Sequence, residues 1–158
     1  MQKITSCLWF DNQGEEAAHF YTTIFKNSQI LEIARYGPAG PGPEGTVMTV
    51  TFELDGHRFV ALNGGPHFTF SEAVSFQVSC ETQDEVDYFW NRLSEGGEEG
   101  PCGWLKDRYG LSWQIVPTAL IELVSDPNTE KSQAAIKAML GMRKIDIEAL
   151  QRAADQAK

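Results

Sequence analysis

The sequence predicts an α+β fold of two similar β-α-β-β-β modules, whose strands would form one eight-stranded, cup-shaped sheet. The main observation is an internal repeat, because residues 6–24 recur at 75–93. Each copy contains a short strand, a polar turn and an amphipathic helix with an aromatic pair on its apolar stripe. Two long copies are typical of a duplicated module and not of a solenoid. Function is expected in the cup between the modules.

Length and composition restrict the class of protein. The chain has 158 residues, the size of a single domain spanning 1–158, and 42% of its residues are hydrophobic. Its net charge of −9 argues against binding to nucleic acid or to an anionic membrane. Three cysteines do not make a disulfide framework, and the N-terminal residues do not resemble a signal peptide. We therefore expect a reduced, cytoplasmic protein.

The first predicted module covers residues 4–63 and contains four strands and one helix. In chain order these are strand 4–10, helix 15–25 and strands 29–36, 47–54 and 58–63. The helix follows from apolar residues at Ala17, Phe20, Tyr21 and Ile24, which share one helical face. Strict alternation predicts strand 47–54, and Asp55-Gly56 predicts the hairpin after it. The Gly/Pro-rich stretch 37–45 must be a loop.

The second module covers residues 73–117 and repeats this order after a Gly-containing connector. Strand 74–80 and helix 84–93 match the first copy, and strands 104–106 and 111–117 form a closing hairpin. A further strand between these parts is only weakly marked. The second module therefore follows the first in element order, with a shorter central turn.

Residues 118–158 form a C-terminal extension with predicted helices at 129–140 and 146–157. Gly141 is expected to end the first helix in a left-handed conformation, and Asp146 to cap the second. Apolar residues such as Ile136, Met139 and Leu150 would give these helices a face with nothing local to cover it. This face would pack across the domain or against a partner subunit.

The two modules resemble the vicinal oxygen chelate (glyoxalase/bleomycin-resistance) superfamily. Two stretches within them carry the resemblance, WFDNQGEEAAHFYTTIF and CGWLKDRYGLSWQIVP. Within this superfamily they are most similar to the PhnB-like group, which has often been labelled 3-demethylubiquinone-9 3-methyltransferase. The resemblance spans about residues 4–117 and implies the two-module fold and a homodimer. No G-x-G-x-x-G-like run follows a strand, so the methyltransferase label has no support in the residues.

The resemblance also implies a divalent metal, held by side chains of the first and last strands of the modules. The corresponding positions here are Ser6, Ser75, Gln114 and, less securely, Ala61. None is an imidazole, thiolate or carboxylate, which are the ligands that such metals prefer. The three histidines, His19, His57 and His67, lack a metal-binding spacing and are interpreted as surface or loop residues. We therefore predict no metal and no cofactor.

One sheet face is predicted to be polar and nearly uncharged. If Val50, Phe52 and Val78 face the helices, strand alternation places Leu8, Glu53 and Ser79 on the opposite face. The same alternation assigns the candidate ligand-binding residues Ser6, Thr49, Thr51, Ser75, Gln77 and Gln114 to that face. Hydroxyls and amides suit hydrogen bonding to a mostly neutral small molecule. The alternative is that these residues only hydrate an open sheet or line a subunit interface.

Glu53 is the one ionisable residue assigned to this face, and if it is partly buried among threonine and serine residues it is the candidate general base. The alternative is an exposed glutamate at a strand end. Lys106 and Arg108 flank the closing hairpin and could contact an anion or simply be solvated. The aromatic residues of the strands and helices, including Trp9 and Trp113, are predicted to be core.

Two functions of different classes agree with these residues. One is a metal-free binding protein for a small molecule, and the other is a lyase, isomerase or dioxygenase-like enzyme acting on a small oxygenated substrate. A dimeric scaffold without a ligand is the third and simplest interpretation.

Overall fold

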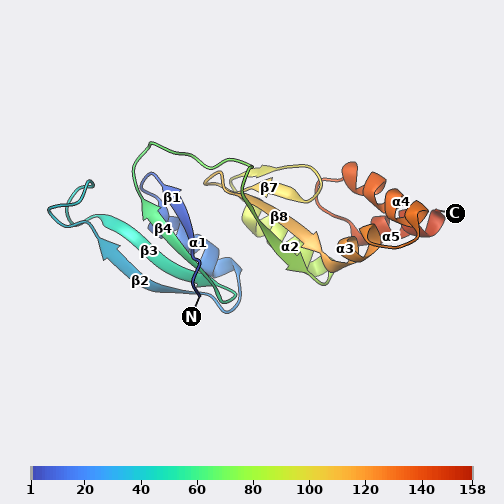
Figure 1. The fold of residues 1–158 in the computed structure, drawn as a ribbon, viewed down its shortest axis with the longest axis horizontal. Coiled ribbons are helices and arrows are strands. Elements are labelled where there is room, and N and C mark those ends of the chain that lie inside the picture. The colour runs from blue at the N-terminus through green and yellow to red at the C-terminus, as the bar shows by residue number, and fades with distance from the viewer. Residues whose placement is uncertain (1, 158) are drawn as a thin grey trace. The chain divides into compact units, whose positions relative to one another are not determined.

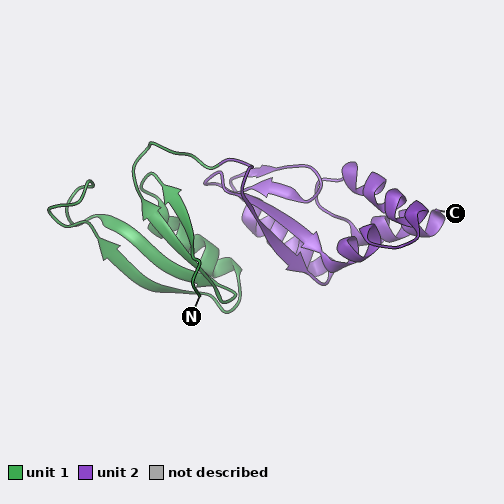
Figure 2. Ribbon diagram, viewed as in Figure 1, with its two compact units in different colours: residues 1–70 green, residues 71–158 purple. Residues whose placement is uncertain are grey.

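A computed structural model describes residues 2–157 of the chain. The elements follow one another in the predicted order, with two β-α-β-β-β modules and a helical extension (Figure 1). The chain divides into two compact units, residues 1–70 and 71–158 (Figure 2), and each is described here by itself. None of the helices in the described part combines the length and the apolar character needed to cross a bilayer.

Unit 1 contains a four-stranded mixed sheet and one helix. Its elements are β1 (Ser6–Phe10), α1 (Gly14–Ile24), β2 (Gln29–Arg35), β3 (Val47–Leu54) and β4 (His57–Asn63). The strand order is β1-β4-β3-β2, with β1 parallel to β4 and the other pairs antiparallel. The first predicted module is therefore confirmed.

Helix α1 covers one face of this sheet. Tyr21 is fully buried and stacks on Phe52 of β3, at a ring-centroid distance of 6.2 Å. Asn63 fixes the start of the helix, because its Oδ1 accepts a hydrogen bond from the Gly14 backbone N–H at 2.8 Å. A Cβ atom on Gly14 would lie 2.7 Å from that oxygen, so this close approach requires glycine.

Unit 2 repeats the arrangement. Its module consists of β5 (Ser75–Cys80), α2 (Gln83–Ser94), β6 (Glu98–Glu99), β7 (Trp104–Lys106) and β8 (Ser112–Pro117). The strand order is β5-β8-β7-β6, which matches unit 1. The weakly marked strand is the two-residue β6. The second module is confirmed, whereas the joining of the two sheets into one eight-stranded cup stays a prediction.

A buried carboxylate shapes the turn between β7 and β8. The side chain of Asp107 is only 2% exposed and accepts hydrogen bonds at both of its oxygens. Its Oδ1 accepts from the backbone N–H groups of Tyr109 and Leu111, at 2.8 and 3.1 Å, and its Oδ2 accepts from the Trp113 indole at 2.9 Å. A charge so far from water requires such partners. Asp107 is therefore a structural residue of the closing hairpin.

The C-terminal extension has three helices, α3 (Thr118–Val124), α4 (Thr129–Leu140) and α5 (Ile147–Gln156). Helix α3 was not predicted. Its Leu120 forms a separate core with Ile145 and Leu150, against which Met139 and Met142 also pack. The expectation that this apolar face has no local cover is therefore wrong, because α3 supplies the cover.

The ends of these helices agree only partly with the prediction. Asp146 caps α5, since its carboxylate accepts from the Ala149 N–H at 3.0 Å. Gly141 has φ −93°, so the predicted left-handed C-cap is wrong. The backbone N–H groups of Gly141 and Met142 instead bond to the carbonyls three residues earlier, at 3.1 and 2.9 Å. This tightened last turn satisfies the carbonyls without a left-handed residue.

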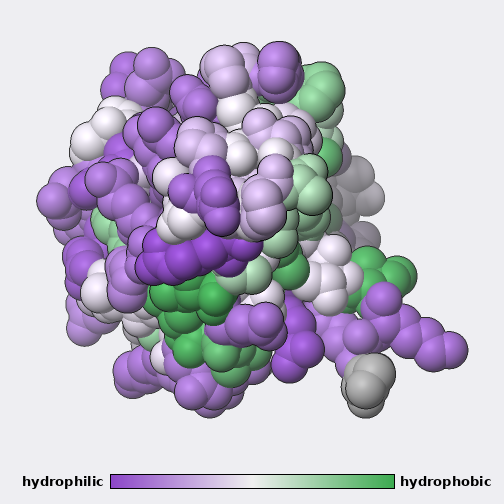
Figure 3. All heavy atoms as spheres, turned by 90° about the vertical axis from the view of Figure 1, so that its left-hand side faces the viewer, coloured by the Kyte–Doolittle hydropathy of each residue, from purple (hydrophilic) through white to green (hydrophobic). Residues whose placement is uncertain are grey.

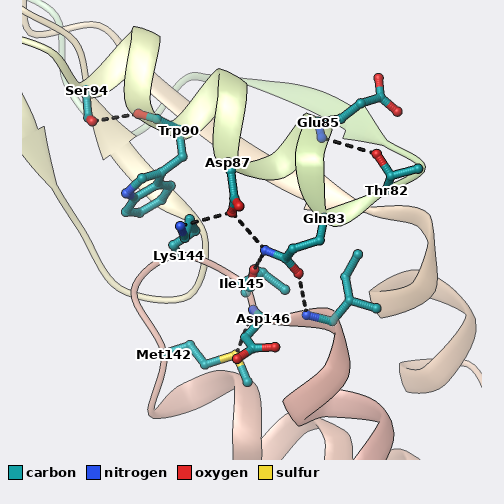
Figure 4. Close-up of polar contacts among 11 residues, drawn as sticks. Thr82, Gln83, Glu85, Asp87, Trp90, Ser94, Met142, Lys144, Ile145 and Asp146 are labelled. Atoms are coloured by element: carbon teal, nitrogen blue, oxygen red, sulfur yellow. Dashed lines mark hydrogen bonds and ion pairs between the residues drawn. The ribbon is translucent and has the colours of Figure 1, made fainter.

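Gln83 joins α2 to the extension (Figure 4). Its side-chain amide donates to Asp87 Oδ1 and to the Ile145 carbonyl, both at 3.0 Å, and accepts from the Ile147 N–H at 2.8 Å. Asp87 also pairs with Lys144 at 2.9 Å. The Gln83 hydrogen bond, followed by that of Lys144, lowers the pKa of Asp87 below its usual value. The Gln83 side chain therefore satisfies two backbone groups near the start of α5, the Ile145 carbonyl and the Ile147 N–H.

A second contact joins the extension to the loop before β7. The Cys102 N–H donates to the Met142 carbonyl and the Gly103 N–H to the Arg143 carbonyl, each at 2.8 Å. Cys102 has φ 58°, in the left-handed region that non-glycine residues seldom occupy. The two hydrogen bonds hold this strained loop against residues 142–143.

Candidate functional site

Strand alternation in unit 1 separates a helix-covered face from an open face. Val50 and Phe52 of β3 are fully buried beneath α1. Thr49, Thr51 and Glu53 alternate with them and lie half-buried on the opposite, open face. The predicted faces of strand 47–54 are therefore confirmed.

The predicted face of Ser6 and Leu8 is wrong. Leu8 and Phe10 are 5% and 3% exposed and belong to the core, and Ser6 shares their side of β1. The parallel register agrees, since Ser6 pairs with the buried Phe59. The error arose because β1 is apolar on both faces, so alternation alone could not decide its orientation. The ligand-binding role of Ser6 stays a prediction, and Ser6 cannot act from the same surface as Thr51.

Cys7 and Trp9 occupy the open face of β1 instead. Trp9 was predicted to be core, but it is half-buried, and its indole N–H donates to the Gly65 carbonyl at 2.9 Å. Its ring meets Phe68 edge to face at a centroid distance of 4.9 Å. The opposite choice of strand orientation would have placed both residues correctly. The open face of unit 1 is thus a mixture of threonines and apolar side chains.

Glu53 lies at the end of this open face. Its carboxylate accepts a hydrogen bond from the Gln29 side-chain amide at 2.8 Å, and Glu53 pairs with Arg58 in the β3–β4 register. The residue is half-buried, which agrees with the partly buried glutamate of the first alternative and not with an exposed one. Its carboxylate is therefore already engaged by a neighbouring strand.

Unit 2 brings three predicted residues together. Ser75, Gln77 and Gln114 lie on the open face of its sheet, where Gln77 and Gln114 are register partners. The Gln114 amide donates to Ser75 Oγ at 2.9 Å, and Gln77 Nε2 approaches Gln114 Oε1 at 3.5 Å. They form a connected row of neutral polar groups on β5 and β8.

Unit 2 also has a pocket of about 460 Å³, whose lining residues Ser112 and Trp104 are the register partners of Ser75 and Gln114. Trp104, Lys106 and Ser112 line it, and all three share the open face with Gln114, to which Trp104 is paired in the register. Gly100 and Pro101 complete the wall beside Trp104. The walls are mainly apolar, which is usual for a small-molecule site.

Ser112 is the most unusual of the lining residues. It is 0% exposed, and its hydroxyl has no hydrogen-bond partner within the part of the chain that the structure describes. Buried hydroxyls nearly always have a partner, so an orphan beside a pocket indicates a place for a ligand atom or water. Ser112 was not among the predicted site residues, although its alternation with Gln114 could have identified its face.

The pocket also carries charge, contrary to the prediction of a nearly uncharged face. Lys106 forms an ion pair with Glu72. The hydrogen bond between the two side chains, reinforced by their opposite charges, raises the pKa of Lys106 and lowers the pKa of Glu72. Glu98, the register partner of Lys106, adds to the rise in the lysine pKa. Both side chains of the pair are therefore charged at neutral pH.

Arg108 does not line the pocket. It pairs with Glu95, at 3.5 Å between guanidinium and carboxylate. Of the two hairpin cations considered as possible anion contacts, Lys106 alone lies at this site.

The metal positions implied by the sequence resemblance do not fit a divalent ion. Ser6 lies on the helix-covered side of β1, and Ala61 provides no donor atom. Ser75 and Gln114 are hydrogen-bonded to each other. Among residues 2–157, no three His, Cys, Asp or Glu side chains gather closely enough to hold a metal. The residues present are therefore suited to hydrogen bonding and not to metal binding.

Comparison with known proteins identifies the family. The model of the family described as 3-demethylubiquinone-9 3-methyltransferase matches residues 2–116. The PhnB protein from Bacillus cereus is 41% identical, with a TM-score of 0.66 over 73% of this chain and 99% of its own. No curated protein matches the chain.

Two further solved structures are similar in fold alone. PA1353 from Pseudomonas aeruginosa is 18% identical, with a TM-score of 0.61 over 74% of this chain and 98% of its own. The fosfomycin resistance protein FosX from Listeria monocytogenes, in complex with Mn(II) and sulfate, is 13% identical, with a TM-score of 0.52 over 74% and 91%. By the family model and by its 41% identity to the PhnB protein, the chain belongs to the 3-demethylubiquinone-9 3-methyltransferase family.

Proposed function

We propose that the protein binds a small molecule at the polar open faces of its sheets, without the metal that is usual in its superfamily. The observation that carries this proposal is the row formed by Ser75, Gln77 and Gln114, two of which are register partners of residues that line a pocket of about 460 Å³. Thr49 and Thr51 contribute hydroxyls on the open face of unit 1. Ser6, the remaining predicted residue, is not used in this proposal.

Hydrogen-bonding capacity supports a ligand role for this row. Each primary amide has two donor hydrogens and an oxygen with two acceptor sites. The contacts of Gln114 to Ser75 and Gln77 use one donor and one acceptor, so the amide can bond to a further group. A ligand with both a donor and an acceptor would match this arrangement.

The methyltransferase activity in the family's name is not part of the proposal. Methyl-donor folds need a glycine-rich turn between a parallel strand and a helix. Here the β1–α1 loop reads DNQ before Gly14, the first residue of α1, and the β5–α2 loop reads ET, so neither turn has the repeated glycines of such a motif. The one glycine at these turns, Gly14, is already packed against Asn63, so the residues do not support a methyl-donor site there.

The second candidate is an enzyme of the lyase, isomerase or dioxygenase-like kind. Glu53 favours it, since this half-buried carboxylate lies on the open face beside Thr51 and could act as a general base. Its test is the Glu53→Gln variant, assayed once a substrate is known. A loss of turnover with substrate binding retained would support the enzyme, and an unchanged rate would exclude Glu53 as the base.

A homodimer in a reducing, cytoplasmic environment completes the proposal. Leu31 and Ile33 of the edge strand β2 are 40% and 37% exposed, and the surface seen in Figure 3 is mainly hydrophilic with a compact hydrophobic area. Leu140 on α4 is also exposed. Apolar surface at a sheet edge favours self-association.

All three cysteines are free, which suits a reducing compartment.

Native mass spectrometry of the full chain tests the binding function. An organic molecule retained by the purified protein, and lost in Gln114→Leu, is the expected result. Gln151→Leu is the control, because Gln151 lies on the exposed side of α5 and bonds only to Asp155 at 3.2 Å among the contacts described. A retained divalent ion at one per chain would overturn metal independence. Retention of the same molecule by Gln114→Leu would show that the row does not bind it.

A further inference from the structure

The shape of the unit 2 pocket defines what kind of molecule it can hold. Its volume of about 460 Å³ lies within the range of roughly 300–1,000 Å³ found for small-molecule sites. Trp104 provides a half-buried indole on the open face of β7, and Pro101 lies next to it in the wall. An apolar body of aromatic size would bury its surface against these two side chains.

The charges around the pocket have an excess of negative sign. Three carboxylates, Glu72, Glu98 and Glu99, line it together with one cation, Lys106. Because Lys106 is paired with Glu72, its charge is already neutralised. A carboxylate or phosphate ligand would have to displace Glu72 and approach the remaining glutamates. A positively charged group would meet one like charge, that of the paired Lys106, against the two further carboxylates of Glu98 and Glu99.

Ser112 gives a second and independent indication of a ligand. Its hydroxyl is buried, has no partner among the described residues, and lies in the register row Glu98–Lys106–Ser112–Ser75 that crosses the sheet. A ligand N–H or oxygen that reached this hydroxyl would satisfy it. This line of register partners therefore combines the buried hydroxyl of Ser112 with the carboxylate of Glu98 on the outer strand β6.

From these observations we propose that the pocket selects an organic cation, a molecule with an apolar ring system and a protonated amine. The ring would pack against Trp104, whose π face also attracts a cation. The amine would lie towards Glu98, and a polar atom of the ligand would bond to Ser112. This inference rests on the proposed small-molecule function and adds the chemical class of the ligand.

Three probes with the same ring system and different charge test the proposal. Naphthylethylamine is a cation at pH 7, naphthylethanol is neutral and naphthylacetate is an anion. Each is titrated into the isotope-labelled full chain, and binding is followed by NMR shifts of the Trp104 indole and the Ser112 amide. The amine should bind about tenfold more tightly than the acetate, which corresponds to about 1.4 kcal/mol. Its shifts should centre on Trp104 and Ser112.

One matched pair of variants and one further variant separate the effect of charge from that of the hydroxyl group. Glu98→Gln should weaken the amine several-fold and leave the neutral alcohol unchanged. Glu122→Gln removes the same charge from an exposed position on α3, outside the pocket, and should affect neither probe. Ser112→Ala should weaken both probes, because it removes the hydroxyl and not a charge.

Some outcomes would overturn the inference. They are equal or tighter binding of the acetate, shifts that centre away from Trp104 and Ser112, and no binding of any probe. The proposed function is judged separately, by the molecule retained in the native mass spectrum and by its loss in Gln114→Leu. A retained anion that depends on Gln114 would thus leave the binding function standing and reject the cationic class.

Discussion

The carboxylate of Asp107 accepts a hydrogen bond from the indole N–H of Trp113 at 2.9 Å, inside the core of unit 2. The two residues lie on opposite sides of the β7–β8 turn, and both are 2% exposed. The turn is thus fixed from within by a carboxylate that is almost completely shielded from water. The pocket residues Lys106 and Ser112 directly flank this turn, so the geometry of the turn also determines where these two residues lie.

We expect Asp107→Asn to destabilise the protein by about 2–3 kcal/mol. The asparagine would keep the shape, but its NH₂ group would face an N–H donor and one hydrogen bond to a charged acceptor would be lost. Denaturant unfolding followed by tryptophan fluorescence measures the change. Asp155→Asn on the exposed side of α5 is the control and should change the free energy of unfolding by less than about 0.5 kcal/mol. Equal stability of the two variants would contradict a structural role for Asp107.

Gln83→Leu should loosen the C-terminal extension and reduce stability by about 2 kcal/mol. The change removes three hydrogen bonds and leaves the Ile145 carbonyl and the Ile147 N–H without their side-chain partner. Hydrogen exchange should show lost protection at the first turn of α5, while the amides of β3 in unit 1 keep theirs. Loss of protection throughout both units would show that Gln83 is not a local anchor.

Ser112→Ala should stabilise the unliganded protein by about 1 kcal/mol. A buried hydroxyl without a partner is unfavourable, and the methyl group of alanine removes that penalty. Ser132→Ala is the matched control, because Ser132 is also buried but donates to the Thr129 carbonyl at 3.1 Å. Thermal unfolding of the two variants should therefore move in opposite directions. A loss of stability in Ser112→Ala would show that the hydroxyl has a partner after all.

Stability should fall as the pH rises above about 9, through the ionisation of Cys80. Burial, followed by the nearby charge of Glu85, raises the pKa of this thiol from 9.0 to about 12. Between these pH values the unfolded chain releases the thiol proton and the folded chain keeps it. The free energy of unfolding therefore decreases as the pH rises. The stabilising contribution is complete below pH 9 and is lost as the pH approaches 12. Denaturation midpoints measured across this range should decline less in Cys80→Ala than in the natural chain.

Elements with a clear local pattern were predictable from the sequence. Strand β3 has the predicted bounds because its residues alternate strictly and Asp55-Gly56 ends it. Helix α3 was missed because only seven residues separate Pro117 from Ser125, and Pro117 gives no side-chain cap to mark the start. Gly141 shows that a glycine at a helix end does not by itself specify a left-handed residue.

The candidate site was predictable only in part. The open-face positions of Ser75, Gln77 and Gln114 were predictable because β5 and β8 alternate, whereas β1 is apolar on both faces and gave the wrong side for Ser6. The buried state of Ser112 depends on neighbours far away in the sequence. The pairing of Lys106 with Glu72 joins a strand to the segment before β5, and no local pattern reveals it.

The hydrogen bonds from Cys102 and Gly103 to residues 142–143 affect how ligand preference can be compared between relatives. These two residues continue directly from Gly100 and Pro101 in the pocket wall, while residues 142–143 lie beyond the 2–116 region shared with the family. One wall of the pocket is thus shaped by a part of the chain that the family match does not cover. A ligand discovered in a relative without residues 142–143 would consequently have to be tested again on this protein, even if every strand residue were the same.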